Sequence, residues 1–450
     1  MKIAIVGAGP AGLAAARVLS EHSVSVDVFD QYPRAGGQYW RHAKNVPFPA
    51  ESFKTTLTSS RLTWLFECSI WQIESEKSGH TIYAIQNGRT IERTYDALLI
   101  ATGAIERPLP IPGWTLPGVM TAGALQSLIK GQGLIPGERI VVAGSGPFLF
   151  PVIESLQKSI QQSSSSNPSS DISIVGIFEA RKLSRWLLNS VGLLLNPEKV
   201  IDAMRFLINL KRKKLRVTTG RVITSINDTN SKNVKRISVM PLKGEKVSNN
   251  ATAQELDCDV IAISYGFTPD LTIPSILKLK TVNKEDDEIV MVDSNQRSSK
   301  LGVWAAGEIT GIGGHELAIR EGEIAALDIL GKGGSLTSAI RKIDRWRKQI
   351  FATGLARVYK VSKRWFEWNA DDVVVCRCEE VSRDEIINSF RELGADSVRT
   401  SKLFTRAGMG MCQGRLCHRN VQDIARVFGS ESTKISRPIG GAVTLGELSD

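Results

Sequence analysis

The chain has 450 residues, a formal net charge of +11, 42% hydrophobic residues and 23% charged residues. This composition is that of a folded globular protein of two to four domains, and it excludes a disordered or fibrous chain. The sequence has no apolar run of 18 or more residues that would predict a membrane span. A strand is expected from residue 2, so we expect no signal peptide and a cytoplasmic location.

Part of the positive charge is concentrated in residues 211–216 (KRKKLR), at the end of a helical pattern. The simplest interpretation is a solvated helix end, where cations also suit the helix dipole. Contact with an acidic partner or peripheral contact with a membrane surface is the alternative. No other part of the sequence resembles a nucleic-acid-binding motif, so we expect no nucleic-acid partner.

The first thirty residues predict a dinucleotide-binding unit. An apolar strand (residues 1–6) leads into a glycine turn, a helical pattern and a second strand that ends at Asp30. In such a unit the glycines allow a tight turn, a close approach to a pyrophosphate and close packing of helix on strand, while the acid accepts hydrogen bonds from a ribose. The expected contacts are Gly7, Gly9, Pro10, Ala11, Gly12 and Asp30.

Three later segments fit the same unit. A polar, glycine-rich loop (Arg34-Ala35-Gly36-Gly37-Gln38) follows the second strand and is placed to reach the same cofactor. Residues 97–103 form a buried strand that ends in Thr102-Gly103. Residues 301–308 form another strand, which ends in Gly307-Glu308, and an alanine-rich helix is expected from His315 to Leu330.

Residues 138–180 repeat the opening pattern with one departure. The strand, the turn Gly144-Ser145-Gly146, a helix from residue 148 to residue 158 and a strand that ends at Glu179 are all present, but Leu149 occupies the third glycine position. Two interpretations stay open, a second nucleotide site for NAD(P) or another nucleotide, and a retained fold whose site is altered or empty. We expect residues 161–170 (QQSSSSNPSS) to form a surface loop.

Four of the six cysteines lie in the last 75 residues, in the pattern C-x-C, 33 residues, C-x4-C. Four thiolates from two loops suit a [2Fe–2S] cluster, with zinc as the structural alternative. A reducing compartment disfavours disulfides. The predicted ligands are Cys376, Cys378, Cys412 and Cys417. Cys68 and Cys258 are most simply buried small hydrophobes.

Together, the first glycine motif with Asp30, the residue 34–38 loop, Thr102-Gly103 and Gly307-Glu308 resemble the glutathione-reductase-like flavoproteins, over residues 1 to about 333. The resemblance implies an α/β, two-dinucleotide-binding flavoprotein fold that holds FAD, with Glu308 near the ribityl chain. The FAD contacts that it implies outside the first motif are Arg34, Gly37, Gln38, Thr102, Gly103, Gly307 and Glu308. Residues 1–350 contain no CxxC or CxxxxC pair, so disulfide reduction is disfavoured. The late cysteines resemble the [2Fe–2S] domain of bacterioferritin-associated ferredoxin.

These similarities imply a division of the chain into parts. We expect a discontinuous FAD domain (residues 1–106 and 296–333) and an inserted second domain of NAD type (107–295). A helical linker (334–369), a small [2Fe–2S] domain (370–430) and a tail (431–450) are expected to follow.

The whole pattern resembles the larger flavoprotein subunits of heteromeric amine dehydrogenases, such as opine oxidase A subunits, hydrogen cyanide synthase B subunits and proline or hydroxyproline dehydrogenase α subunits. The segments 104–108 (AIERP), 112–119 (PGWTLPGV) and Arg437-Pro438 with Leu445-Gly446 strengthen the match. The family implies a separate, smaller FAD subunit that oxidises the C–N bond of the substrate, while this chain receives the electrons. FMN at a subunit interface is a further candidate cofactor. The resemblance leaves the amine or imino-acid substrate, the electron acceptor and the subunit stoichiometry open.

No residue stands out as a catalytic base. His315 is a weak candidate beside the flavin and is equally a helix-start residue. Two other functions are therefore kept. One is a standalone NAD(P)H-dependent FAD/Fe–S reductase that uses Gly144, Gly146 and Glu179, and the other is a carrier of the cluster without catalytic activity.

Overall fold

The structure is a computed structural model that describes residues 1–43, 46–166, 171–229, 234–248, 251–285, 287–369, 371–428 and 439–449. Its first sheet is parallel, in the order β21-β7-β1-β2-β3. The strands are β1 (Lys2–Val6), β2 (Ser25–Phe29), β3 (Leu62–Leu65), β7 (Ala97–Ile100) and β21 (Val303–Ala305). β1 and β7 are buried on both faces, which explains why they read as continuous apolar runs.

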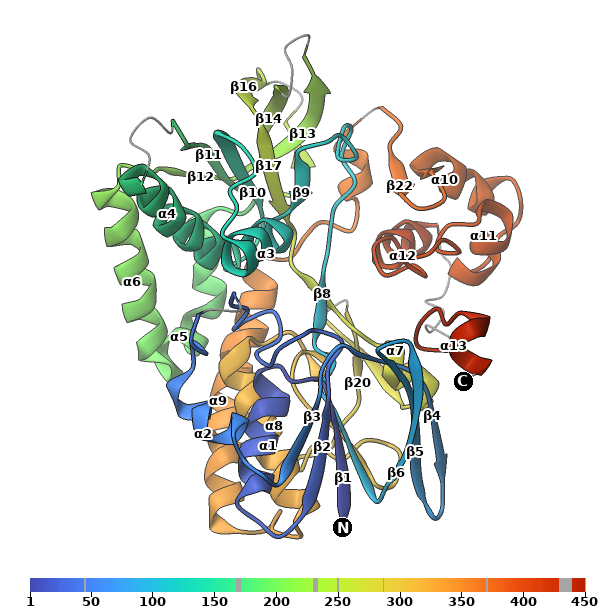
Figure 1. The fold of residues 1–450 in the computed structure, drawn as a ribbon. Helices are drawn as coiled ribbons and strands as arrows, with labels where there is room; N and C mark the ends of the chain where they lie inside the picture. The colour runs from blue at the N-terminus through green and yellow to red at the C-terminus, as the bar shows by residue number, and fades with distance from the viewer. Residues whose placement is uncertain are drawn as a thin grey trace.

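Different layers cover the two faces of this sheet. On one face, α1 (Pro10–Ser20) packs against α8 (His315–Ile329), and α9 (Leu336–Val358) packs on α8 (Figure 1). On the other face lies an antiparallel sheet of β4 (Cys68–Glu76), β5 (Gly79–Gln86) and β6 (Arg89–Tyr95). Residues far apart in sequence, such as Val6, Leu271 and Val303, share the core on this second face. The first domain is therefore built from both ends of the flavoprotein region.

The second domain contains another parallel sheet, in the order β12-β11-β10-β17-β9. Its strands are β9 (Val119–Thr121), β10 (Arg139–Gly144), β11 (Ser173–Glu179), β12 (Val217–Thr219) and β17 (Val260–Ser264). α3 (Ala122–Gln132) and α4 (Leu149–Ser166) pack on one face. The other face is covered by β13 (Arg221–Asp228), β14 (Lys235–Lys243), β15 (Lys246–Val247) and β16 (Gln254–Cys258). Two connections, β8 (Ala104–Glu106) and β18 (Phe267–Pro269), pair between the domains.

The expected loop at residues 161–170 is wrong in its first part. Residues 161–166 continue α4 as helix, because no proline or glycine occurs between Pro151 and Pro168 and each further residue adds one backbone hydrogen bond. The remaining residues, 167–170, lie outside the described residues.

The C-terminal domain is small and helical. It contains β22 (Val374–Cys376), β23 (Val381–Ser382), α10 (Arg383–Arg391), α11 (Val398–Thr405) and α12 (His418–Val427). Capping boxes at Ser382 and Ser397 start α10 and α11. Figure 1 shows this domain beside β8, at the side of the molecule away from α6 (Pro197–Arg212).

The end of the chain returns to the first domain. The Gly440 N–H donates to the Trp71 carbonyl on β4 at 2.7 Å, and α13 (Leu445–Ser449) packs on β6. The predicted motif residues Arg437 and Pro438 lie outside the described residues. None of the helices in the described ranges combines the length and hydrophobicity that crossing a bilayer requires.

Candidate cofactor sites

Two of the three glycines in the first turn, Gly7 and Gly12, leave no room for a side chain. Gly7 has φ +107°, and a Cβ on it would lie 2.3 Å from the Ala101 carbonyl oxygen. A Cβ on Gly12 would lie 1.8 Å from the Gly7 oxygen, so the start of α1 approaches β1 as closely as backbones allow. Gly9 differs, because a Cβ there would meet nothing within 4 Å and no side chain caps the helix. Helix α1, with Pro10 at its first position, therefore presents open N–H groups to a ligand, as a pyrophosphate requires.

Asp30 lies buried beside this turn. Its Oδ2 accepts the Ala8 N–H at 2.7 Å and its Oδ1 accepts the Tyr32 N–H at 2.8 Å. Burial raises the pKa of Asp30, while these two hydrogen bonds oppose that shift. The carboxylate thus ties the glycine turn to the end of β2, where a ribose would bind.

The residue 34–38 loop packs directly on the glycine turn. Gly37 has φ +56°, and a Cβ on it would lie 3.0 Å from the Gly9 Cα. Arg34 donates to the His42 carbonyl at 3.0 Å, and Gln38 donates to the Tyr32 hydroxyl at 2.8 Å. A cavity opens between this loop and α3. Its lining includes Tyr32, Arg34, Gly37, Arg41, Ser127 and Leu128.

The late motif Gly307-Glu308 lies beside the first glycine turn. A Cβ on Gly307 would lie 3.1 Å from the Ala11 Cβ, so the two glycine motifs touch although nearly 300 residues separate them. The Glu308 carboxylate accepts the Gly314 N–H at 2.7 Å, and burial raises the pKa of Glu308 to about 7. Thr102, at the end of β7, donates to the Asp270 carbonyl at 3.0 Å, and Gly103 beside it has φ +79°.

Sequence reasoning missed Glu321. This buried carboxylate on α8 accepts the Gly307 N–H at 2.9 Å, the Thr310 hydroxyl at 2.7 Å and the Arg345 guanidinium at 3.0 Å. It therefore fixes the turn that carries Glu308. Its only sequence signal is an acid within an alanine-rich helix, and that signal alone does not distinguish a buried acid from an exposed one.

His315 begins α8 within an aromatic cluster. Its ring stacks on Tyr39 at 3.9 Å between centroids and meets Trp40 edge-on at 6.2 Å. Burial lowers the pKa of His315 to about 4, so the imidazole is neutral near pH 7. This environment accounts for His315 through packing and gives it no proton to donate as an imidazolium.

These observations fit FAD. The open helix N-terminus, the buried acid at the end of β2 and the two interlocked glycine motifs are the contacts that an adenine dinucleotide needs.

The second glycine turn folds in the same way as the first. Gly144 has φ +148°, and a Cβ on it would lie 1.7 Å from the Ser264 oxygen. A Cβ on Gly146 would meet nothing within 4 Å. Glu179 accepts the Gly146 N–H at 3.1 Å and the Arg181 N–H at 2.9 Å, much as Asp30 holds the first turn. Burial raises the pKa of Glu179 to about 7.

The chain itself covers this second turn. The segment after α9 crosses the carboxyl ends of β10 and β11, where nucleotides bind in such sheets. Ser145 in the turn donates its hydroxyl to the Tyr359 carbonyl at 3.2 Å. The Arg181 guanidinium donates to the Lys360 carbonyl, and Arg185 donates to the Val358 carbonyl at 3.0 Å. Residues 358–360 therefore occupy hydrogen-bonding groups of Ser145, Arg181 and Arg185 beside this turn, while Gly146 itself faces open space.

The four late cysteines meet as two pairs in the C-terminal domain. Cys376 ends β22, Cys417 precedes α12, and the two thiols hydrogen-bond. That bond lowers the pKa of Cys376 to about 5, assisted by the Gly408 N–H at 3.4 Å. Cys378 and Cys412 form the other hydrogen-bonded pair.

This paired arrangement fits a binuclear cluster, in which each iron takes two thiolates. Within the described ranges, no group of three or more Cys, His, Asp or Glu side chains has the compact arrangement of a mononuclear metal site. Sequence reasoning missed Gly410. A Cβ there would lie 2.3 Å from the Cys378 Cβ, so the second loop can approach the first only with glycine at this position.

The C-terminal domain packs on the proline-rich crossover that follows β8 (residues 107–118). The buried Arg107 guanidinium pairs with Asp423 on α12, and Asn420 donates to the Pro108 carbonyl at 2.9 Å. Trp114 donates its indole N–H to the Val374 carbonyl at 2.7 Å. One continuous hydrophobic core joins the crossover, the second domain and the C-terminal domain.

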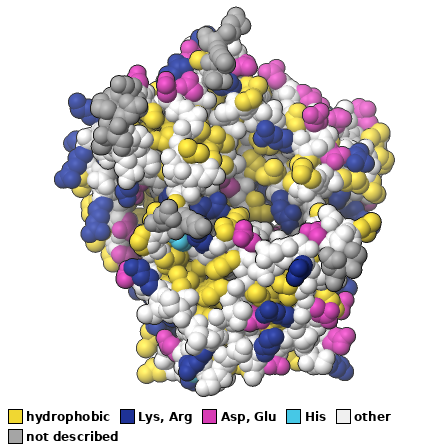
Figure 2. Space-filling view, in the orientation of Figure 1, with side chains coloured by type: hydrophobic (Ala, Val, Ile, Leu, Met, Phe, Trp, Pro, Cys, Tyr) yellow, Lys and Arg dark blue, Asp and Glu magenta, His cyan; other side chains and the backbone are white. Residues whose placement is uncertain are grey.

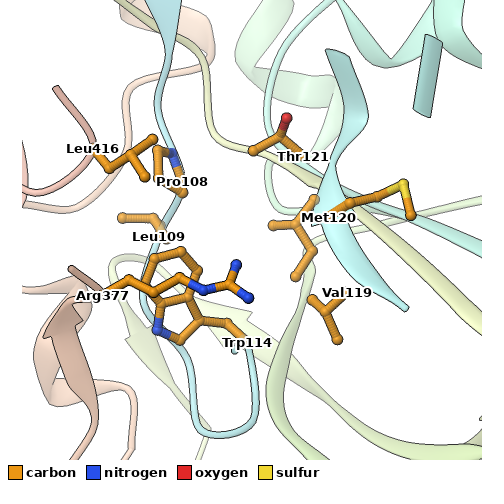
Figure 3. A pocket seen from close by; sticks show the side chains of 9 residues that line it. Pro108, Leu109, Trp114, Val119, Met120, Thr121, Arg377 and Leu416 are labelled. Carbon is orange, nitrogen blue, oxygen red and sulfur yellow. The ribbon is translucent and has the colours of Figure 1, made fainter. Parts of the chain in front are cut away.

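A small pocket opens beside this crossover. Arg377 and Leu416, which neighbour cluster cysteines, line one side, and Val119, Met120 and Thr121 line the other (Figure 3). Figure 3 shows Arg377 extended over the ring of Trp114, with its guanidinium 6.0 Å from the ring centroid. The pocket therefore gives access to the cluster loops from the second domain.

The remaining cysteines do not form a redox pair. Cys68 and Cys258 are both buried, and burial raises the pKa of Cys68 to about 11 and that of Cys258 to about 12. They lie in different cores. Thiols of this kind are unreactive.

Comparison with known proteins agrees with these sites. Residues 1–148 match the pyridine nucleotide-disulphide oxidoreductase family, and residues 374–426 match the BFD-like [2Fe-2S] binding domain. The predicted fold class is confirmed, and so are the predicted cofactors, FAD and a [2Fe–2S] cluster.

Curated relatives match along the whole chain. Hydrogen cyanide synthase subunit HcnB of Pseudomonas aeruginosa is 30% identical over 96% of this chain and 95% of its own length. The opine oxidase A subunit of Rhizobium meliloti is 30% identical over 99% of this chain and 98% of its own length. Among solved structures, L-proline dehydrogenase from P. horikoshii shares the fold with a TM-score of 0.69 and 19% identity, over 99% of this chain and 79% of that one.

Proposed function

Because the chain belongs to the family of oxidoreductase subunits that includes hydrogen cyanide synthase subunit HcnB and the opine oxidase A subunits, we propose that it transfers electrons in a heteromeric dehydrogenase. In this proposal a smaller FAD-dependent subunit oxidises the C–N bond of an amine or imino acid, and this chain receives the electrons. Candidate substrates are opines, proline or hydroxyproline, glycine and sarcosine-like amines. The relatives' names, which include the alpha subunit of sarcosine oxidase, support such a complex.

The partly covered second nucleotide turn carries the proposal. A standalone NAD(P)H reductase needs that turn open, whereas Ser145 and Arg181 are bonded to the chain's own residues 359 and 360. Electrons would then enter this chain from a protein partner. FAD and the cluster supply the redox chemistry when bound, while Asp30 and Glu308 orient the flavin nucleotide and the four cysteines hold the cluster.

The proposal extends to the location of the protein, to a further cofactor and to the residues that position the cluster domain. A cytoplasmic location follows from the need to keep four closely spaced thiols reduced. FMN at a subunit interface stays a prediction. Arg107 and its neighbours act as positioning residues, because they hold the cluster domain against the crossover that leaves the FAD domain.

The test is anaerobic reduction of the chain co-purified with its small subunit. Opines, proline, glycine and sarcosine are added separately, and the flavin and cluster absorbance bands are followed. We expect one of these substrates to bleach both bands and NADH alone to bleach neither. The Cys412→Ser variant should lose acceptor reduction, whereas Cys68→Ala, which changes a buried thiol outside the cluster, should retain it.

Three results would contradict the proposal. Rapid bleaching by NADH without substrate would favour the standalone reductase. Full acceptor reduction by Cys412→Ser would remove the cluster from the electron path. A cluster that transfers to apo-proteins beside a flavin that never turns over would favour a carrier.

A further inference from the structure

The segment after β11 exposes a large apolar surface. This segment contains η2 (Leu183–Asn189), α5 (Ser190–Leu195) and α6, and in the 16 residues of α6 only Leu210 is buried. The large apolar side chains exposed to solvent here are Leu183, Leu187, Leu188, Val191, Leu194, Val200, Ile201, Met204, Leu207 and Ile208. We call this set the apolar face. It is far more apolar surface than one helical hairpin of a monomer ordinarily leaves uncovered.

The apolar residues of α6 follow helical spacing. Val200, Met204, Leu207 and Ile208 recur at intervals of three and four, so they form one stripe along the helix. Another side of the helix is anchored to the protein, where Phe206 packs on Phe150 with 4.4 Å between ring centroids. The helix is therefore held by the protein while its apolar stripe faces outward.

The same segment holds most of the protein's excess charge. Residues 182–216 contain nine Lys or Arg and two acids, a net charge of +7 out of +11 for the whole chain. Lys211, Arg212, Lys213, Lys214 and Arg216 are exposed at the end of α6. In the described part of the chain, none of these five cations forms an ion pair. Figure 2 shows Lys and Arg side chains along the edge of the molecule where α6 lies in Figure 1.

We propose that α5 and α6 dock the protein on an anionic lipid surface. An outward apolar stripe bordered by cations is the arrangement of helices that lie in the membrane interface, with the apolar side chains among the acyl chains and the cations on lipid phosphates. The binding faces of protein–protein interfaces are instead depleted of lysine. The docking is peripheral, and it goes beyond the proposed electron transfer because it needs no redox step.

The experiment is co-sedimentation of the cofactor-loaded full chain with vesicles. One set contains phosphatidylglycerol mixed with phosphatidylcholine, and the other contains phosphatidylcholine alone. We expect binding to the first set only, weakening as salt rises. Lys213→Gln with Lys214→Gln should weaken binding by about 30-fold, since each cation near the surface contributes roughly 1 kcal/mol. Leu207→Ser with Ile208→Ser should weaken it by about tenfold or more.

Matched controls lie elsewhere on the surface. Lys243→Gln with Lys246→Gln removes two exposed lysines, and Leu301→Ser changes a leucine that is 96% exposed. Both should bind vesicles like the unaltered protein. The proposal is overturned if the unaltered protein sediments with neither vesicle, or if the controls lose as much binding as the α6 variants. It is also overturned if the α6 variants keep vesicle binding but no longer co-purify with the small subunit, because the face would then be a protein interface.

Discussion

The Arg107 guanidinium and the Asp423 carboxylate, 316 positions apart in sequence, form a buried ion pair that joins the crossover from the FAD domain to the [2Fe–2S] domain. Arg419 adds further pairs to Asp287 and Asp423, and Asn420 bonds to the backbone of Pro108. The [2Fe–2S] domain is thus held by these buried charges and by a hydrophobic core that it shares with the crossover and the second domain. Its position is part of the fold, which is what electron transfer between fixed centres requires.

Arg107→Gln should therefore weaken the docking of the [2Fe–2S] domain. The change leaves the buried Asp423 with Arg419 at 3.3 Å and Arg426 at 3.7 Å as its ion-pair partners. We therefore expect a loss of stability smaller than the about 3–5 kcal/mol that breaking a buried pair outright typically costs. Urea unfolding followed through the cluster absorbance measures the effect. Arg236→Gln is the control, because Arg236 and its partner Asp257 lie at the surface and their pair should matter little. Equal midpoints for the two variants would show that the buried pair does not hold the domain.

Gly410→Ala should prevent normal assembly of the cluster. Its Cβ would overlap Cys378, and the loop that carries Cys412 would have to move away. We expect iron and acid-labile sulfide to fall well below the level of about two of each per chain that a [2Fe–2S] cluster supplies. Gly131→Ala in α3 meets nothing within 4 Å and should keep the full cluster. Normal iron in Gly410→Ala would mean that the loops do not approach as closely as described.

Asp30→Ala should weaken FAD binding. The substitution removes the carboxylate that holds the Ala8 N–H and that would accept from the ribose. A hydrogen bond to a charged group contributes about 1.5–3 kcal/mol, so the dissociation constant for FAD should rise roughly 10- to 100-fold. Flavin fluorescence during titration of the deflavinated protein measures it. Asp96→Ala, at an exposed carboxylate, is the control, and an unchanged dissociation constant for Asp30→Ala would exclude the ribose role.

The sequence predicts those parts of the sites that depend on local spacing. Gly7, Gly12 and Asp30 lie within one strand–turn–helix–strand unit, where each residue type has a steric or hydrogen-bonding reason. Gly307 is recognisable for the same reason, since a glycine ends a buried strand there. The C-x-C and C-x4-C pairs predict the ligand set without any knowledge of the fold.

Contacts between distant segments leave no comparable pattern. Ser145 and Tyr359 are 214 positions apart, and nothing near either residue indicates that the chain partly covers its own second nucleotide turn. Leu149 indicated an altered site but not what alters it. Arg107 reads as part of a linker, although its partner lies in another domain. Such pairings depend on how the domains pack, and only a structure supplies that.

The carboxyl of Glu179 should make stability depend on pH. Burial raises its pKa to about 7 in the folded state from an ordinary value of 4.5. The folded protein therefore binds the proton more tightly than the unfolded chain does, and this contribution is fully present below pH 4.5 and is lost as pH rises through 7. The shift corresponds to at most about 3 kcal/mol.

Glu179→Gln, which cannot ionise, should remove that slope. Urea unfolding of the FAD-loaded protein at intervals between pH 5 and pH 8 measures how stability changes with pH in the variant and in the unaltered protein. Burial also raises the pKa of Glu308 to about 7, so the difference between the two proteins is needed to isolate the contribution of Glu179. Glu154→Gln changes a half-exposed glutamate on α4 and should leave the slope as it was. Parallel stability curves for Glu179→Gln and the unaltered protein would mean that Glu179 stays ionised in the folded protein. Residues 358–360 would then cover Glu179 less completely than the contacts of Ser145 and Arg181 indicate.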